Sequence, residues 1–182
     1  MIATRFGTVR GLVRLALSHG ELRLGRGDVS VGDPAAIRRL VFVCHGNICR
    51  SAFADVAARR AGLSVASFGL SAESGKPAHG PAIEAAMRIG HDMAEHRATD
   101  LSDYVAQEGD LLLAMETRQL RRIAGDARVA TLPRTLLGLY TRPRVPHLHD
   151  PYSLSDAYMD VCLARIATAI PVLRATFPNA RT

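Results

Sequence analysis

Short apolar runs alternate with longer amphipathic segments along most of the chain. The short runs are rich in branched and aromatic side chains, as buried strands are; they are residues 39–43 (RLVFV), 65–69 (VASFG), 110–115 (DLLLAM) and 128–133 (RVATLP). The longer segments space their apolar residues as helices do; they are residues 51–64, 81–90, 116–125 and 155–177, the last capped at Ser153 or Ser155. Strands that alternate with helices predict an α/β fold, a four-stranded parallel sheet with helices on both faces.

Residues 1–37 follow a different pattern and are predicted to form a basic, helical N-terminal extension to a main domain of residues 38–182. Phe6, Val9, Val13 and Leu17 lie near helical spacing. Residues 1–40, which include Arg38 and Arg39 at the start of the main domain, hold seven arginines and three acidic residues, so they carry +4 of the total net charge of +6 and leave +2 for the remaining 142 residues. The helix either packs on its own domain or a partner protein, or lies on an anionic membrane surface.

Composition and charge limit the classes of function. Hydrophobic residues make up 48% of the 182 residues, enough to bury a core without disulfides. The 142 residues after position 40 carry a net charge of only +2, and aromatic residues are not interleaved with basic ones. Both features argue against a nucleic-acid partner. No run of about 20 apolar residues is present in the sequence, the N-terminal pattern leads us to expect no secretory signal, and three cysteines do not make a disulfide framework. We therefore expect a cytoplasmic protein.

The stretch CHGNICRS, residues 44–51, joins the first strand of the main domain to its first helix. Ligands bind at this carboxyl edge of a parallel sheet. Gly46 and Asn47 tolerate left-handed backbone angles, so the loop can turn its N–H groups toward an anion, and the helix start adds partial positive charge. Arg50 supplies a fork of donors that matches two oxygens of a phosphoryl group. The candidate substrate-binding residues of the loop are His45, Gly46, Asn47, Ile48, Cys49 and Ser51.

Cys44 is the candidate nucleophile, because surroundings that hold a phosphate dianion also favour a thiolate. Ser51 can donate a hydrogen bond to that sulfur. Near the C-terminus, the stretch HDPY supplies Asp150 as a general acid and base, and Tyr152 as a ring that can stack on a flat substrate. Phosphoryl transfer to sulfur by these groups requires no metal and no organic cofactor.

A metal site or a structural disulfide accounts for the cysteines less well than a nucleophile does. The spacing of Cys44 and Cys49 does not match common zinc sites, and no second cysteine pair follows. A structural disulfide between them is possible but disfavoured in the cytosol, whereas a reversible one would protect an oxidised nucleophile. Cys162 lies in an apolar helical segment and is predicted to be a core residue.

With these residues the sequence resembles the low-molecular-weight protein tyrosine phosphatase family, whose loop is written C-x-G-N-x-C-R-S. The resemblance extends over about residues 38–178 and includes the DPY of residues 150–152. It implies a catalytic domain with Cys44 as nucleophile, Arg50 as phosphate clamp and Asp150 as general acid. The family also braces its loop by hydrogen bonds, here implied for Asn47, Ser51, Ser67 and His96.

The sequence departs from the family at several positions. Ala52 replaces a frequent proline, Glu116 stands where aspartate is common, and residues 70–79 lack the aromatic residue that many members place against the substrate ring. His45 stands at a variable position at the mouth of the pocket. These departures leave the substrate preference open.

The resemblance implies a phosphatase acting on phosphotyrosine in a protein substrate, with phosphate or a similar oxyanion held in the loop. Arsenate reductases on the same scaffold need two further cysteines, and residues 111–125 contain none. Protein arginine phosphatases carry threonine where Ile48 stands. A non-catalytic module that binds phosphoproteins is the third alternative, although such members usually lose the nucleophile, the arginine or the acid.

Overall fold

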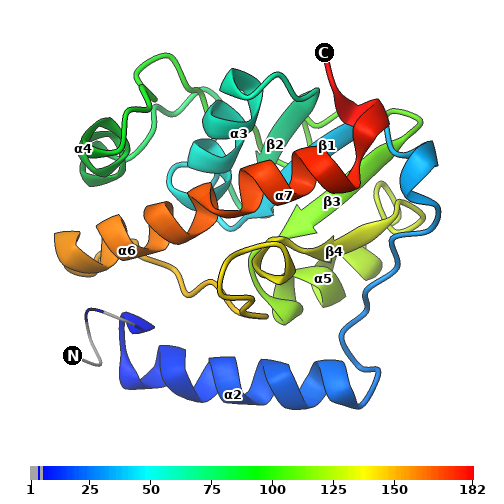
Figure 1. The fold of residues 1–182 in the computed structure, drawn as a ribbon, viewed down its shortest axis with the longest axis horizontal. Coiled ribbons are helices and arrows are strands. Elements are labelled where there is room, and N and C mark those ends of the chain that lie inside the picture. Colours follow the sequence, from blue (N-terminus) through cyan, green and yellow to red (C-terminus); the bar gives the residue numbers. More distant parts are fainter. Residues whose placement is uncertain (1–3, 5) are drawn as a thin grey trace.

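Four parallel strands form the centre of the molecule (Figure 1). The computed structural model describes Thr4 and residues 6–182. The strands are β1 (Arg39–Cys44), β2 (Val65–Gly69), β3 (Asp110–Ala114) and β4 (Arg134–Leu136), in the spatial order β2-β1-β3-β4. Leu40 of β1 is paired with Val65 on one side and with Leu111 on the other. The predicted four-stranded parallel sheet is confirmed.

The fourth strand lies further along the chain than the sequence predicted. Residues 128–132, predicted as strand, form turns in which the N–H groups of Val129 and Ala130 donate to the carbonyl of Asp126. Pro133 has no N–H to donate, but its carbonyl accepts from Leu112 of β3. Val129 and Leu132 therefore belong to turns and not to a strand, and β4 begins only at Arg134.

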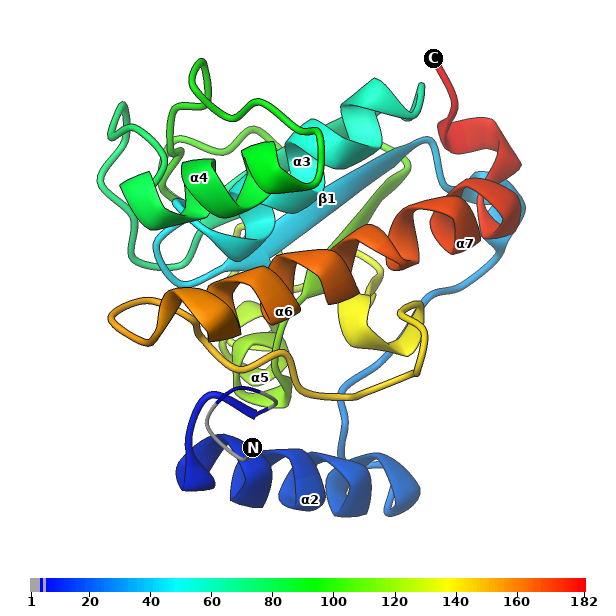
Figure 2. The same ribbon diagram turned by 60° about the vertical axis from the view of Figure 1, so that its left-hand side comes forward.

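Helices cover both faces of the sheet, as predicted. One face is covered by α3 (Arg50–Arg60), α4 (Gly80–Arg88), α6 (Asp156–Ala167) and α7 (Ala169–Thr176) (Figures 1 and 2). The other face packs Val41 and Val43 against Leu120 and Ile123 of α5 (Thr117–Ala124). Short 3₁₀ turns span Pro34–Ala36, Leu137–Leu139 and Pro178–Ala180.

The last predicted helix is in fact two helices. Ser155 caps α6 by accepting from the N–H of Tyr158, one of the two caps considered. The helix stops at Thr168, and α7 starts at Ala169. Pro171 in the first turn of α7 lacks the N–H that a continuous helix would need at that position, which explains the break.

The N-terminal extension forms helix α2 (Val9–Arg23), which is capped by the hydroxyl of Thr8. The helix lies along the molecule below α5 and the chain that leads into α6 (Figures 1 and 2). Leu15 packs against the core cluster on one side of the sheet and Leu22 against the cluster on the other. Among the described residues, no helix is long and apolar enough to span a bilayer.

The apolar residues that predicted α2 do not face the domain. Val9, Val13 and Leu17 are 66%, 52% and 62% exposed, on the side of the helix away from the sheet. The buried positions are instead Gly11 and Ser18. The helix therefore has a second apolar side that the rest of the described chain leaves uncovered.

Candidate active site

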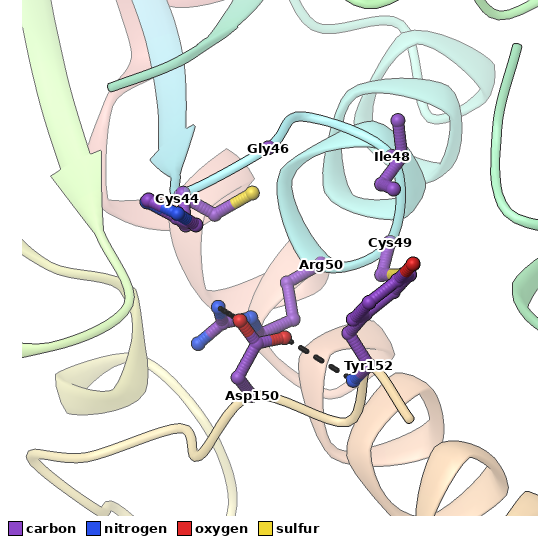
Figure 3. A pocket seen from close by; sticks show the side chains of 8 residues that line it. Cys44, Gly46, Ile48, Cys49, Arg50, Asp150 and Tyr152 are labelled. Carbon is purple, nitrogen blue, oxygen red and sulfur yellow. Dashed lines mark hydrogen bonds and ion pairs between the residues drawn. The ribbon is translucent and has the colours of Figure 1, made fainter. Parts of the chain in front are cut away.

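A pocket of about 120 Å³ opens where β1 ends and α3 begins (Figure 3). Its lining consists of Cys44, His45, Gly46, Ile48, Cys49, Arg50, Asp150 and Tyr152. These are eight of the ten residues proposed from the sequence, drawn from two segments about 100 residues apart. The other two, Asn47 and Ser51, are fully buried beside the loop. The parallel sheet thus presents its carboxyl edge to this pocket, as its topology requires.

Asn47 fixes the shape of the loop. Its backbone adopts φ 51°, in the left-handed region that asparagine tolerates. Its side chain donates to Ser51 Oγ (2.8 Å) and accepts from the N–H of Thr99 (2.9 Å). Its carbonyl accepts from His96 Nε2 at 2.8 Å. These contacts fit the braces implied for Asn47, Ser51 and His96.

His96 contributes to the loop as a neutral side chain. Burial lowers the pKa of His96. The hydrogen bond to the Asn47 carbonyl requires the proton on Nε2. Ser67, the fourth implied brace, differs, because its hydroxyl makes no hydrogen bond to the loop within the described chain. Its side chain lines a separate groove between β2 and the segment after α4.

The sulfur of Cys44 lies among hydrogen-bond donors. Ser51 Oγ is 2.9 Å from Cys44 Sγ, and the N–H of Asn47 donates to the sulfur at 3.2 Å. The first turn of α3 begins at Arg50, so its unpaired N–H groups add partial positive charge beside the loop. A negatively charged sulfur would be stabilised by each of these groups.

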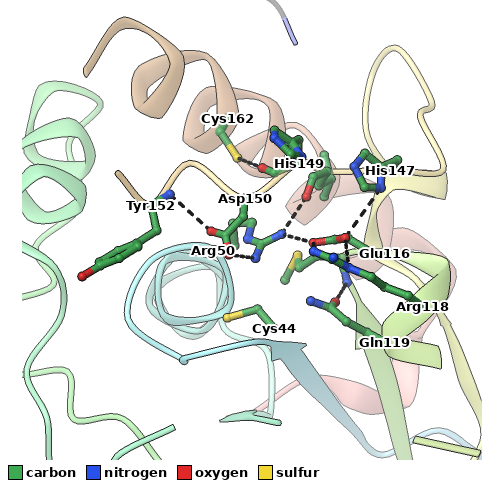
Figure 4. A network of polar contacts seen from close by, with 12 residues as sticks. Cys44, Arg50, Glu116, Arg118, Gln119, His147, His149, Asp150, Tyr152 and Cys162 are labelled. Atoms are coloured by element: carbon green, nitrogen blue, oxygen red, sulfur yellow. Dashed lines mark hydrogen bonds and ion pairs between the residues drawn. The ribbon is translucent and has the colours of Figure 1, made fainter. Parts of the chain in front are cut away.

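Arg50 is held rigidly beneath the pocket (Figure 4). Its side chain is 1% exposed. Nη1 donates to Glu116 Oε1 and to the Leu148 carbonyl, both at 2.8 Å, while Nη2 lies 2.8 Å from Asp150 Oδ2. Among the described residues, Nε is buried without a hydrogen-bond partner. Burial alone would lower the pKa of Arg50, but Asp150 and Glu116 raise it above its usual value.

Glu116, which the sequence marked only as a departure from the family, is a partner of Arg50 in this site. It lies two residues after the end of β3 and is fully buried, with Oε2 2.6 Å from Nε of Arg118. Burial alone would raise the pKa of Glu116, but Arg50 and Arg118 lower it to about 2. A signal was available in the sequence, because a charged residue just past a buried strand meets the neighbouring carboxyl end of β1.

Asp150 and Tyr152 are placed by a loop that three elements hold. The N–H of Leu148 donates to the Met115 carbonyl at 3.0 Å, and Tyr158 of α6 donates to the His149 carbonyl at 3.3 Å. The side-chain oxygen Oγ1 of Thr8, which precedes α2, lies 3.1 Å from Nε2 of His149. The Asp150 side chain is 31% exposed at the pocket, which suits a group that exchanges protons with solvent.

The pocket walls differ in character. Tyr152 is 54% exposed, and its ring lies 4.9 Å from the ring of His79. Ile48 and Tyr152 together form an apolar side to the pocket (Figure 3). Such a wall suits a flat aromatic leaving group.

The remaining thiols are free and buried. Burial raises the pKa of Cys49, and it raises the pKa of Cys162 to about 12. Cys49 lines the pocket beside Cys44, whereas Cys162 lies on α6, in the hydrophobic core. Within the described part of the chain, no group of three or more His, Cys, Asp and Glu side chains is arranged to hold a metal ion.

Comparisons with known proteins show the family of the chain. The family model for the low molecular weight phosphotyrosine protein phosphatases matches residues 39–180. A probable low molecular weight protein-tyrosine-phosphatase of Ralstonia solanacearum, EpsP, is 43% identical over 89 residues, which cover 48% of this chain and 61% of that protein. The chain thus matches about three fifths of the length of this relative.

Solved structures share the fold. The tyrosine phosphatase Wzb from Escherichia coli K30, in complex with sulphate, is 28% identical with a TM-score of 0.64, over 74% of this chain and 94% of Wzb. The YwlE arginine phosphatase from Geobacillus stearothermophilus has a TM-score of 0.65 at 24% identity, over 76% of this chain and 91% of YwlE. The second likeness concerns the fold alone.

Proposed function

The chain belongs to the low molecular weight phosphotyrosine protein phosphatase family, and on this premise we propose that it hydrolyses phosphotyrosine through a cysteinyl-phosphate intermediate. The observation that carries the proposal is a single pocket lined by Cys44, Arg50 and Asp150. A thiol, a buried guanidinium and a partly exposed carboxyl are the nucleophile, the oxyanion clamp and the proton donor that this reaction requires.

In the first step, the Cys44 thiolate attacks phosphorus and the bond from phosphorus to the leaving oxygen breaks. Asp150 donates a proton to that oxygen. Arg50 and the loop N–H groups stabilise the charge on the three other phosphoryl oxygens. In the second step, water attacks the phosphorus, Asp150 accepts its proton, and the sulfur leaves as a thiolate that Ser51 and the Asn47 N–H stabilise.

The clamp is prepared before substrate binds. Glu116 and the Leu148 carbonyl occupy Nη1 of Arg50, and Asp150 contacts Nη2, while Nε has no partner among the described residues. Nε therefore faces the oxyanion without a competing bond, and Nη2 joins it when Asp150 turns to the leaving oxygen. Because the guanidinium is buried and bonded on its far side, it does not have to be ordered when phosphate arrives.

The apolar wall favours an aryl ester over the alternatives. Ile48 and Tyr152 can contact a tyrosine ring, whereas a phosphoarginine guanidinium would gain nothing from Ile48. Arsenate reduction would need a relay of thiols, and Cys162 in the core does not supply one. A protein that only binds phosphate would not need a nucleophile, a clamp and an acid in one pocket.

Turnover of matched peptides tests the reaction. We expect hydrolysis of a phosphotyrosine peptide, much slower hydrolysis of the matched phosphoarginine peptide, and no arsenate reduction with thioredoxin. Cys44→Ser should abolish turnover, while Cys162→Ala, which alters a buried thiol outside the pocket, should retain it. Rapid quenching should trap phosphate on Cys44. Binding of phosphopeptide without turnover would instead indicate the non-catalytic module.

Cys49 supports a redox role for the pair of pocket cysteines. We propose that mild peroxide converts Cys44 to a sulfenic acid and that the Cys49 thiol displaces water from it, forming a disulfide that thiol reductants reverse. A Cys49→Ser variant should then lose activity irreversibly at peroxide doses from which the wild type recovers. Equal recovery of both would contradict the protective disulfide.

The partner classes follow from the reaction and the surface. The substrate is a phosphotyrosine-containing protein, and phosphate or a similar oxyanion occupies the loop; we propose a cytoplasmic location. Residues 1–37 can add a contact with a membrane surface or a protein through Val9, Val13 and Leu17 on α2, which Arg10 accompanies. Cosedimentation of the full chain with anionic and neutral vesicles, compared with Val13→Ser, tests the membrane contact.

A further inference from the structure

A second groove adjoins the catalytic pocket on the side of α5. It encloses about 290 Å³ and is lined by His45, Leu70, Arg118, Gln119, Arg122 and Asp150. His45 and Asp150 belong to both hollows, so the groove and the pocket share a rim. Successive residues of an extended peptide are about 3.3–3.6 Å apart, so a residue one or two positions from the phosphorylated one can reach this groove.

The charge of the groove is not balanced. Arg122 is exposed, and its guanidinium donates to the Leu70 carbonyl and to Ser71 Oγ, which are both neutral acceptors. The nearest acidic residue further along the chain, Asp126, is paired with Arg128 at 2.7 Å. Among the described residues Arg122 forms no salt bridge, and Asp126, which feels its charge, is committed to Arg128, so Arg122 brings a fixed positive charge to the groove.

The second arginine of the groove, Arg118, shares its carboxylate partner with Arg50. Arg118 is 47% exposed and contacts Glu116, the same carboxylate that holds Arg50 (Figure 4). One carboxylate thus serves two guanidinium groups. Asp150 faces Arg50 from the opposite side. The three arginines around this rim exceed the two carboxylates by one charge, and His45 is exposed beside them.

We propose that this groove binds an acidic side chain of the substrate, next to the phosphorylated residue. The inference rests on the proposed phosphatase activity and deepens it, because it names the sequence context that the enzyme prefers. The Leu70 and Ser71 contacts hold the Arg122 guanidinium in place, so a carboxylate can bind it with a small loss of side-chain freedom. The opposite side of the pocket, formed by Ile48 and Tyr152, supplies no such charge.

Matched phosphotyrosine peptides test the groove. One peptide carries two aspartates on the N-terminal side of phosphotyrosine, one carries them on the C-terminal side, and the third has asparagine at all four positions. We expect one acidic peptide to show a kcat/KM about fivefold above the asparagine peptide at low salt, and this ratio should approach one in 0.5 M NaCl. A salt-dependent preference is the signature of an exposed ion pair.

Two variants locate the preference. Arg122→Gln is chosen because the partners of Arg122 are neutral, whereas Arg118 also supports Glu116. This variant should bring the ratio of kcat/KM for the acidic and the asparagine peptides close to one. The control is Arg88→Gln on α4, another exposed arginine, whose partner is Asp160, away from the groove. This control should keep the wild-type ratio.

Three outcomes overturn or redirect the proposal. Equal kcat/KM for all three peptides, or a full acidic preference in Arg122→Gln, would show that the groove does not bind a carboxylate. If no peptide is hydrolysed, the proposed activity fails instead. Binding of the same peptides to Cys44→Ser then decides the groove separately, because tighter binding of an acidic peptide supports it and equal binding overturns it.

Discussion

Helix α2 touches the loop that carries Asp150 at a place with no room for a methyl group. A Cβ added at Gly11 would lie 2.9 Å from Cδ2 of the His149 ring and 2.2 Å from the Phe6 carbonyl oxygen. We predict that Gly11→Ala displaces α2 from this loop. Because His149 directly precedes Asp150, the displacement should also disturb the proton donor.

The magnitude follows from two opposing effects. Alanine in a helix interior is about 1 kcal/mol more favourable than glycine, whereas forcing an extra methyl into a packed contact costs about 1–3 kcal/mol. Gly20 lies in the same helix, and a Cβ there would meet nothing within 4 Å. Gly20→Ala therefore gains the helical preference without the clash, and the two variants should differ in unfolding free energy by about 1–3 kcal/mol.

Urea denaturation measures this difference, and leaving-group dependence separates an effect on Asp150 from a loss of stability. Gly11→Ala should slow hydrolysis of phenyl phosphate, whose leaving group needs a proton, more than that of p-nitrophenyl phosphate. Gly20→Ala should match the wild type on both substrates. If Gly11→Ala is as stable as Gly20→Ala, or slows both substrates equally, the close contact does not position the donor.

Three further changes test the site. Asp150→Ala should lower kcat for phenyl phosphate by roughly 10²–10⁴-fold and spare p-nitrophenyl phosphate; an equal loss on both would remove Asp150 as the acid. Glu116→Gln leaves the buried Arg50 with one carboxylate fewer and should lower the urea unfolding free energy by about 3–5 kcal/mol, while the exposed control Glu73→Gln should change it by under about 0.5 kcal/mol. Burial lowers the pKa of His147 from 6.5 to about 4, so the unfolded chain takes up this proton at a higher pH than the folded protein does. The free energy of unfolding should therefore fall by about 3 kcal/mol as the pH drops from 6.5 to 4. His147→Leu should flatten this part of the stability profile measured by urea denaturation; an unchanged slope would contradict the assignment.

The sheet could be predicted from the sequence because its buried strands are short runs of apolar residues. The strand over residues 39–43 and the helix over residues 81–90 carry unambiguous patterns and turn residues, and both are present. The run over residues 128–133 looks equally strand-like, but the turn contacts to Asp126 outcompete its β preference. These bonds span only three and four residues, but backbone groups make them, so the pattern of apolar side chains does not reveal them.

The residues proposed for catalysis could be picked out for a different reason. Cys44, Arg50 and Asp150 fit a motif whose chemistry limits the residue types allowed. Glu116 carries no such motif, and its partnership with Arg50 joins residues 66 positions apart. The groove beside α5 was also beyond sequence reasoning, because Arg118 and Arg122 are ordinary exposed helix residues until the fold brings them beside His45.

The two-sided packing of α2 bears on where the folded unit begins. Similarity to the family starts at residue 39, yet the half-buried Leu15 and Leu22 pack against the core clusters on opposite sides of the same sheet. A protein shortened to the region that matches the family model would expose both of these contact areas to water and leave the ring of His149 without Thr8. Such a shortened enzyme would tend to self-associate, and its kinetics would describe a different molecule from the full chain.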